Sequence, residues 1–254
     1  MLRKVGLADD VNDFSNRLWR EKDEMKLENV KKSVGDFTLE IPYLMIEEGR
    51  IHGFIGGNGS GKTTTAKLIM DILKPDSGRI DYGGLTLREI TMTAQRPYLL
   101  HASVYENLIY PLKIRGIRTE EKKLDNLLEE FGLLHKKKQY AGSLSSGERQ
   151  KLSMLRAMVF QPKMIIVDET LSNMDTESVE KFEEWILKGQ KEKPITWIMI
   201  SHSLAHIYRL CDRVHFFADG RVTASGTRDE ILFGNQDERI RRFVSKELIR
   251  EEKR

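Results

Sequence analysis

A glycine-rich stretch constrains this chain more than any other feature of its sequence. Residues 56–63 read GGNGSGKT and fit the pattern G-x-x-x-x-G-K-[ST] at every fixed position. The apolar run Ile51–Ile55 precedes the stretch, and the helical pattern Thr64–Leu73 follows it until Lys74-Pro75. Glycines let successive backbone N–H groups face one anion, and the following helix adds unpaired N–H groups and the positive end of its dipole. This order of strand, loop and helix predicts a cradle for a polyphosphate rather than a flexible surface loop.

The side chains of this stretch extend the prediction to metal binding and catalysis. Lys62 is placed to reach the β- and γ-phosphates of a nucleoside triphosphate, and the Thr63 hydroxyl is placed to ligate Mg²⁺. We therefore predict that the ligand is ATP with Mg²⁺. The residues expected to contact the nucleotide through this stretch are Gly56, Gly57, Asn58, Gly59, Ser60, Gly61, Lys62, Thr63 and Thr64.

Two adjacent carboxylates end a second apolar strand. Residues 164–167 are Met, Ile, Ile and Val, and Asp168 and Glu169 follow them. Ligands of an open parallel sheet bind beyond the carboxyl ends of its strands, so Asp168 is expected to face the Mg²⁺ held by Thr63. Glu169 points elsewhere and is expected to polarise the water that attacks the γ-phosphate. A helix N-cap is the plainer interpretation of such a pair, but the phosphate loop upstream favours catalysis.

Strand and helix patterns alternate along the centre of the chain. Residues 165–167 and 197–200 are unbroken apolar runs, which suit a parallel sheet buried on both faces. Their alternation with helices predicts an α/β fold. Residues from about 97 to 160 differ, because apolar residues recur there at helical spacing without any strand pattern, and they are predicted to form an inserted helical subdomain. The residues that carry this spacing are Leu124, Leu127, Leu128, Phe131 and Leu134.

The N-terminal residues 1–24 are predicted to be an extension of the main domain. Val11, Phe14 and Leu18 recur at helical spacing and predict a short amphipathic helix. A strand-like segment opens at Met25, so the sequence alone leaves open whether translation starts there or at the first residue.

The C-terminal residues 236–254 are predicted to form a charged helix after a main domain that covers 25–235. Ile240, Phe243 and Leu248 are expected to form its thin apolar stripe.

Composition excludes several classes of protein. Charged residues make up 32% of the chain and the net charge is +3. Lysine and arginine alternate with aspartate and glutamate, so we expect a solvated surface and no nucleic-acid partner. No apolar run approaches the 18 or so residues of a membrane span, and no signal peptide follows Met1. Cys211 is the only cysteine, which excludes an internal disulfide and fits a reducing, cytosolic setting.

Several further motifs follow one another in a fixed order around the phosphate loop and the carboxylate pair. Gln95 lies in TAQRP, residues 144–148 read LSSGE before a helix, Asp175 ends SNMD, and His202 lies in ISHS after the last apolar strand. With these motifs the chain resembles the nucleotide-binding subunits of ABC transporters over about residues 26–232, nearly its whole length. Their signature is L-S-G-G-Q, so this chain carries Ser for the first Gly and Glu for Gln.

The resemblance implies a fold and further site residues. The fold is a P-loop NTPase core of the ABC-ATPase type, with a mostly parallel sheet, an N-terminal antiparallel β region and the inserted helical subdomain. Gln95 is implied to sense Mg²⁺ and the membrane partner, and His202 to contact the γ-phosphate. Both are therefore counted as catalytic with Lys62 and Glu169. The residues that the resemblance adds to the nucleotide site are Ser145, Ser146, Gly147, Glu148 and Asp175.

One departure from the family concerns the nucleobase. The family usually stacks an aromatic ring on adenine just before a glycine, and this chain has Val34 before Gly35. Val34 is still counted with the nucleotide-binding residues, but stacking there is weak or supplied by Phe37 instead, which leaves selectivity between ATP and GTP open. Thr170 also replaces the proline that commonly follows the catalytic glutamate, and we expect this change to be tolerated.

The resemblance implies that the chain is the ATP-hydrolysing subunit of an ABC transporter. Ser145 is expected to complete the site of a second chain, in a homodimer or a pair with another ATPase subunit that closes head to tail around two ATP molecules. The expected partners are integral membrane permease subunits, with or without a solute-binding protein, and residues 103–112 are expected to contribute to that interface. The chain would then be cytoplasmic and peripheral on the inner face of the cell membrane.

The cargo and the rival functions stay open on sequence alone. The stretch 94–100 is similar to importers of oxyanions such as tungstate, or of amino acids. An alternative is a soluble ABC ATPase without a transport role, such as a cluster-assembly ATPase. A third class is a nucleotide-binding module that does not hydrolyse, and Glu169 and His202 argue against it.

Overall fold

A computed structural model describes residues 24–251 of the chain. The helix predicted around Val11, Phe14 and Leu18 lies outside the described residues, so it stays a prediction. Within the described part, the division into a domain at 25–235 and a terminal helix at 236–254 also stays a prediction.

A mixed sheet of nine strands organises the described residues, in the order β4-β1-β2-β9-β8-β3-β7-β6-β5. The strands β3, β5, β6, β7 and β8 are parallel to their neighbours in this half of the sheet, whereas β1, β2 and β4 pair antiparallel. The predicted α/β fold with an N-terminal antiparallel region is therefore confirmed. The strands are β1 Met25–Val34, β2 Phe37–Ile46, β3 Ile51–Gly56, β4 Ser77–Asp81, β5 Ile90–Thr93, β6 Met164–Asp168, β7 Thr196–Ile200, β8 Arg213–Ala218 and β9 Arg221–Thr227.

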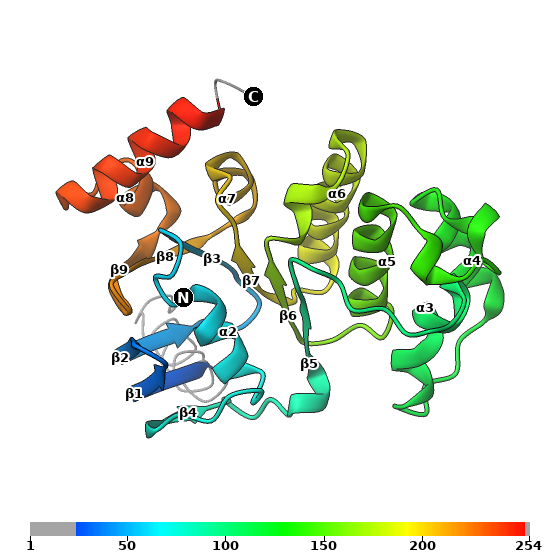
Figure 1. The fold of residues 1–254 in the computed structure, drawn as a ribbon, viewed down its shortest axis with the longest axis horizontal. Coiled ribbons are helices and arrows are strands. Elements are labelled where there is room, and N and C mark those ends of the chain that lie inside the picture. The colour runs from blue at the N-terminus through cyan, green and yellow to red at the C-terminus, as the bar shows by residue number, and fades with distance from the viewer. Residues whose placement is uncertain (1–23, 252–254) are drawn as a thin grey trace, which may run out of the picture.

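Helices cover the sheet and extend beyond it (Figure 1). Alternate residues of β6 point to opposite faces, so Ile165 and Val167 pack with α5 and α6 while Ile166 packs with α2. The core therefore has two parts, one on each face of the sheet. The α-helices are α2 Lys62–Ile69, α3 Val104–Lys113, α4 Glu121–Glu130, α5 Ser146–Met158, α6 Thr176–Glu192, α7 Leu204–Leu210, α8 Arg228–Leu232 and α9 Glu238–Glu251. Single 3₁₀ turns cover η1 Leu87–Glu89, η2 Leu134–Lys136, η3 Ala141–Ser143 and η4 Thr170–Asn173.

The predicted helical insertion is confirmed. Helices α3, α4 and α5 lie between β5 and β6 in the chain, and in Figure 1 they stand on the side of the molecule away from β1, β2 and β4. Leu124 and Leu128 are buried on one face of α4, as their spacing of four residues predicts. Asn107 is fully buried in α3 and bonds both the backbone N–H and the carbonyl of Leu100, which fixes the chain that enters the insertion.

Helix α2 is shorter than the predicted run Thr64–Leu73, because it ends at Ile69. Asp71 has a φ of 57°, in the left-handed region. The N–H of Ile72 bonds the carbonyl of Lys67, five residues back, at 2.9 Å. This is a Schellman cap built on an aspartate, so the helix stops before Lys74-Pro75 is reached.

The stripe predicted on α9 needs one correction. Ile240 is buried and Phe243 is partly buried, but Leu248 is 46% exposed. Val244 and Glu247 are buried instead, at spacings of four and seven residues from Ile240. The face toward the domain is therefore rotated from the predicted one, and Arg250 pairs with the buried Glu247 carboxylate at 3.0 Å.

Candidate nucleotide site and groove

The glycine loop connects the carboxyl end of β3 to the first turn of α2. Gly61 has a φ of 108° and begins α2, and a Cβ added there would lie 2.5 Å from Leu39 Cδ1. Gly56 has a φ of 138°, and its added Cβ would lie 2.1 Å from the Phe217 carbonyl oxygen. Both positions therefore require glycine, and the loop backbone can approach a phosphate closely.

Lys62 lies inside this loop with 5% of its surface exposed. Its Nζ donates to the carbonyl oxygens of Gly56 and Gly57, both at 2.8 Å. Burial lowers the pKa of the Lys62 ammonium, while the carboxylates of Glu169 and Asp168 act in the opposite direction. A buried ammonium held by two carbonyls is matched to an incoming polyanion.

Thr63 and Asp168 meet at the carboxyl edge of the sheet, as the sequence predicts. Thr63 Oγ1 donates to Asp168 Oδ2 at 3.0 Å and lies 3.3 Å from Oδ1. Burial raises the pKa of the Asp168 carboxyl, and the hydrogen bond from Thr63 partly offsets this. A hydroxyl and a carboxylate beside a phosphate loop are the hard oxygen ligands that Mg²⁺ takes, so the residues present fit this ion.

Glu169 is held between two other predicted site residues. Gln95 Nε2 donates to Glu169 Oε2 at 2.8 Å. His202 Nε2 lies 2.8 Å from Glu169 Oε1. The backbone of Glu169 has a φ of 51°, a strained value for a residue with a Cβ, and its N–H bonds the Ile200 carbonyl at 2.9 Å. This turn directs the Glu169 side chain away from Asp168, into the space between the glutamine and the histidine.

Lys62, Thr63, Gln95, Glu169 and His202 line one cavity of about 510 Å³. The predicted site residues Gly56, Gly57 and Asp168 do not line it, and Asp168 is linked to it by its bond with Thr63. Phe37 contributes an aromatic ring to it, whereas Val34 does not line it and is 48% exposed at the end of β1. The residues that line the cavity are Phe37, Asn58, Gly59, Ser60, Gly61, Lys62, Thr63, Thr64, Gln95, Glu169 and His202.

The signature residues lie elsewhere, at the start of α5. Ser145 Oγ accepts from the Glu148 N–H at 3.3 Å, and Glu148 Oε2 accepts from the Ser145 N–H at 2.9 Å. Lys136 also pairs with Glu148 at 2.6 Å. The glutamate that departs from the family pattern thus completes a capping box. Ser145, Ser146, Gly147 and Glu148 are not among the residues that line the cavity of the same chain.

Asp175 is also used within the chain rather than at the cavity. Its Oδ1 caps α6 by accepting from the Ser178 N–H at 2.9 Å. Its Oδ2 pairs with Lys151 of α5 at 2.9 Å. This ion pair with Lys151, together with the bonds from Ser178, holds the pKa of the Asp175 carboxyl well below its usual range.

The sequence interpretation missed two contacts of α5 that lie next to the site. Lys151 joins α5 to Asp175, and Gln150 Nε2 donates to the Gln95 carbonyl oxygen at 2.5 Å. Both residues follow the signature directly in the sequence. Neither contact has a local signal, because the partners lie 24 and 55 positions away.

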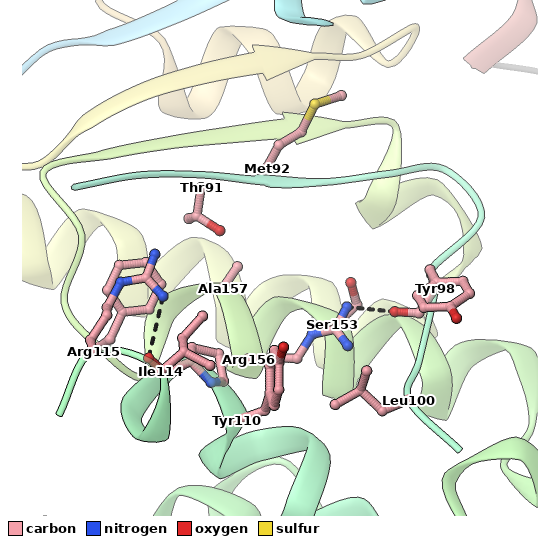
Figure 2. A pocket seen from close by; sticks show the side chains of 12 residues that line it. Thr91, Met92, Tyr98, Leu100, Tyr110, Ile114, Arg115, Ser153, Arg156 and Ala157 are labelled. Carbon is pink, nitrogen blue, oxygen red and sulfur yellow. Dashed lines mark hydrogen bonds between the residues drawn. The ribbon is translucent and has the colours of Figure 1, made fainter. Parts of the chain in front are cut away.

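A separate groove runs between β5, the segment that follows it, and helices α3 and α5 (Figure 2). It encloses about 280 Å³. The Arg115 guanidinium lies 3.7 Å from the centroid of the Phe160 ring, and Arg156 Nη2 donates to the Tyr98 carbonyl at 2.5 Å. The residues that line the groove are Thr91, Met92, Tyr98, Leu100, Tyr110, Pro111, Ile114, Arg115, Ser153, Arg156, Ala157 and Phe160.

The groove combines exposed apolar surface with uncompensated positive charge. Tyr98 is 80% exposed and Ile114 is 59% exposed. Both guanidinium groups bond backbone carbonyls, and none of the described residues that line the groove is acidic. Of the two tyrosines predicted near an interface, Tyr110 lines this groove, whereas Tyr105 packs against the core.

The phosphate loop, the Thr63–Asp168 pair and the held Glu169 at one edge of an α/β sheet define a P-loop nucleoside triphosphatase. Residues 39–172 match the family model described as ABC transporter. The chain belongs to the ABC transporter family and is one of its ATPases. Within the described residues, no helix has both the length and the apolar character needed to cross a membrane.

Individual relatives agree with this assignment. The chain is 35% identical over 206 residues to the tungstate uptake system ATP-binding protein TupC of Peptoclostridium acidaminophilum. The match covers 78% of this chain and 96% of TupC. It is 31% identical to the methionine import ATP-binding protein MetN 1 of Bacillus cereus, over 87% of this chain and 70% of that one.

Two solved structures share the fold. One is the ATP-binding subunit of an ABC transporter, with a TM-score of 0.78 and 25% identity over 88% of this chain and 99% of that one. The other is cbiO1 of Clostridium perfringens, described as part of the ABC transporter complex cbiONQ, with a TM-score of 0.66 and 30% identity. The match covers 89% of this chain and 93% of cbiO1.

Proposed function

We propose that this ATPase uses Mg²⁺ and Glu169 to hydrolyse ATP, and that it drives a membrane permease that imports a small solute. The observation that carries the catalytic part is the cavity that brings Lys62, Thr63 and Glu169 together. Thr63 and Asp168 would hold Mg²⁺, which would neutralise charge on the phosphate oxygens.

The contacts of the cavity support a proposed role for each side chain. The Lys62 ammonium and the loop N–H groups hold the β- and γ-phosphates in place of the carbonyls that Lys62 now contacts. Water attacks the γ-phosphorus, its proton passes to the Glu169 carboxylate, and the bond from phosphorus to the ADP oxygen breaks. Gln95 and His202 each hold one oxygen of the Glu169 carboxylate and so orient it, and each oxygen keeps a lone pair that can take the proton.

We further propose that two copies of the chain form a head-to-tail dimer. Ser145 is the N-cap of α5, and this end of the helix lines no part of the cavity in its own chain. The free N–H groups of the first helical turn are therefore available to a γ-phosphate held by another chain. A γ-phosphate touched from both sides gives ATP, and not ADP, a preference for the closed dimer. Hydrolysis then removes the bridge and the dimer opens.

We also propose that a helix of the permease docks in the groove between β5, α3 and α5. The groove offers the apolar Ile114, Tyr98 and Tyr110, which suit one face of an inserted helix. Arg115 and Arg156 favour a helix that also carries a carboxylate. Its wall includes the segment after Gln95, so docking contacts the same segment that reaches Glu169. The protein would accordingly work at the inner face of the cell membrane.

The cargo is inferred from the relatives alone. TupC is named for tungstate uptake and MetN 1 for methionine import, so an oxyanion or an amino acid is proposed. The permease, with or without a solute-binding protein, would select between them. Pull-down from native membranes, followed by uptake assays with labelled tungstate and methionine, tests this step. Recovery of a soluble assembly complex without any multi-span protein would contradict it.

Phosphate release by the Glu169→Gln variant tests the catalytic assignment. We expect turnover to fall at least about 100-fold while ATP binding is retained, because the amide cannot take the proton. Turnover equal to that of the wild type would show that Glu169 is not the base.

A further inference from the structure

Gln150 is a buried side chain that the proposed mechanism does not use. It lies on the second turn of α5 and is 2% exposed. Its Nε2 donates to the Gln95 carbonyl oxygen at 2.5 Å, across 55 positions of sequence. Its Oε1 is buried and has no hydrogen-bond partner among the described residues.

Only the nitrogen of the Gln150 amide is hydrogen-bonded among the described residues, and this fixes the orientation of the amide. Turning the amide over would place Oε1 against the Gln95 carbonyl, where two acceptors repel, so the donor must face Gln95. The acceptor is left unpaired, which is unfavourable for a buried group. The amide of Gln150 therefore contributes one donor, and that donor goes to the Gln95 backbone.

The bond from Gln150 continues directly to the catalytic carboxylate. Gln150 holds the backbone of Gln95, and the Gln95 side chain donates to Glu169 Oε2 at 2.8 Å. At the other end, Ser145 caps the same helix α5, a single element of 13 residues. The signature end of α5 and the Glu169 carboxylate are therefore joined by two hydrogen bonds and one helix.

We propose that Gln150 is a positioning residue that sets where Gln95 lies relative to Glu169. The inference rests on the proposed role of Glu169 as the base. The Gln150 amide holds the Gln95 backbone and thereby fixes the Gln95 side chain that donates to Glu169 Oε2. Gln95 would also be one of the residues that meet Mg²⁺, so a displaced Gln95 would weaken both contacts. A displacement of α5 would in this way reach the catalytic base of the same chain.

The Gln150→Met variant tests this role, because methionine keeps the length and removes the donor. We expect kcat to fall about tenfold and the Mg²⁺ concentration for half-maximal activity to rise severalfold. The KM for ATP is expected to stay within twofold and the melting temperature within about 2 °C, since the unpaired Oε1 is removed as well. A merely structural role would instead lower the melting temperature and leave the Mg²⁺ dependence unchanged.

The chain offers a control in Gln190→Met, although the amide oxygen of Gln190 also accepts from the Ile195 N–H at 2.7 Å. Gln190 Nε2 also donates to a backbone carbonyl, that of Gly49, at 3.0 Å, but at the end of the sheet away from the glycine loop. This variant is expected to keep the wild-type Mg²⁺ dependence.

A double-mutant cycle with Gln95→Ala separates the proposed pathway from a general weakening of α5. In the Gln95→Ala background, Gln150→Met should change kcat by less than twofold, because the side chain that joins residue 95 to Glu169 is already absent. Equal tenfold losses in both backgrounds would overturn the proposal. If Glu169→Gln is inactive while Gln150→Met retains wild-type Mg²⁺ dependence, the positioning role fails and the proposed function stands.

Discussion

The nucleotide cavity and the groove differ in how their charged groups are satisfied. In the cavity, Thr63 pairs with Asp168, and Glu169 is bonded on both oxygens by other side chains. In the groove, Arg115 and Arg156 bond backbone carbonyls, as Lys62 does in the cavity, but no acidic side chain among the described residues lines the wall. The cavity therefore supplies side chains for the chemistry proposed for it, whereas the groove lacks a negative charge that another protein can supply. Changes in the cavity should consequently alter turnover of the isolated protein, and changes in the groove should alter only its response to a partner.

The largest effect is expected inside the cavity, from Lys62→Ala. Loss of the buried ammonium removes charge stabilisation at the transferring phosphoryl group, and kcat/KM should fall at least about 100-fold. Steady-state phosphate release measures this change. Lys74→Ala is the control, because Lys74 lies beyond α2 and pairs with Asp71 on the surface. Comparable losses in the two variants would remove the distinction between the cavity and the rest of the surface.

Acid should weaken the sheet beneath the cavity before it weakens the helices around the groove. His52 and His215 are buried and stacked in β3 and β8, with His52 Nδ1 and His215 Nε2 3.0 Å apart. Burial lowers the pKa of His52 to about 4 and that of His215 well below its usual value. The unfolded chain binds these protons near pH 6.5, so the full stability is present above that pH and is lost as the pH falls toward 4.

His52 alone should cost about 3 kcal/mol of unfolding free energy between pH 7 and pH 4. Urea unfolding at several pH values measures the loss, and hydrogen exchange locates it. Exchange should rise first in β3 and β8, which carry the two buried histidines, and later in α3 to α5. The same midpoint at pH 7 and pH 5 would contradict this expectation.

Substitutions in the groove should separate stimulation from basal turnover. Tyr98→Ala and Ile114→Ala remove exposed apolar side chains, so basal phosphate release should stay within twofold. Stimulation by the co-purified permease should fall about tenfold, since the docking helix loses apolar contact. Tyr43→Ala is the control, because Tyr43 is 53% exposed on β2 and lies outside the groove. Undiminished stimulation in both groove variants would remove the docking assignment.

The smallest effect is expected at the nucleobase. Phe37 lines the cavity and Val34 does not, so Phe37→Ala should weaken ATP binding severalfold while Val34→Ala changes it less than twofold. Stacking on a ring does not read the hydrogen-bonding edge of the base, so GTP should lose affinity in parallel with ATP. Titration of both nucleotides by calorimetry measures these changes. A larger loss for Val34→Ala would return the stacking role to that position.

The features that the sequence predicted well are those with local causes. The loop from Gly56 to Thr63 and the strand that ends in Asp168 are encoded by glycines and apolar runs whose meaning does not depend on distant residues. The helical insertion likewise follows from spacing alone, as Leu124 and Leu128 show.

The features that escaped prediction depend on tertiary structure. Helix α2 ends early because Asp71 takes a left-handed conformation. An aspartate in a sequence predicts that conformation only weakly. Val244 replaces Leu248 on the buried face of α9 because the domain surface, and not the helix, selects the rotation. The hydrogen bond from Gln150 to Gln95 joins residues 55 positions apart, so no local sequence pattern predicts it.

A crystal structure with Mg²⁺ and a non-hydrolysable ATP analogue tests the central claim most directly. We predict the γ-phosphate against the loop N–H groups and Lys62, with Mg²⁺ at Thr63, and Ser145 of a second copy on the opposite side of that phosphate. An analogue bound outside the loop, or a closed pair whose Ser145 residues face away from the phosphates, would contradict the account.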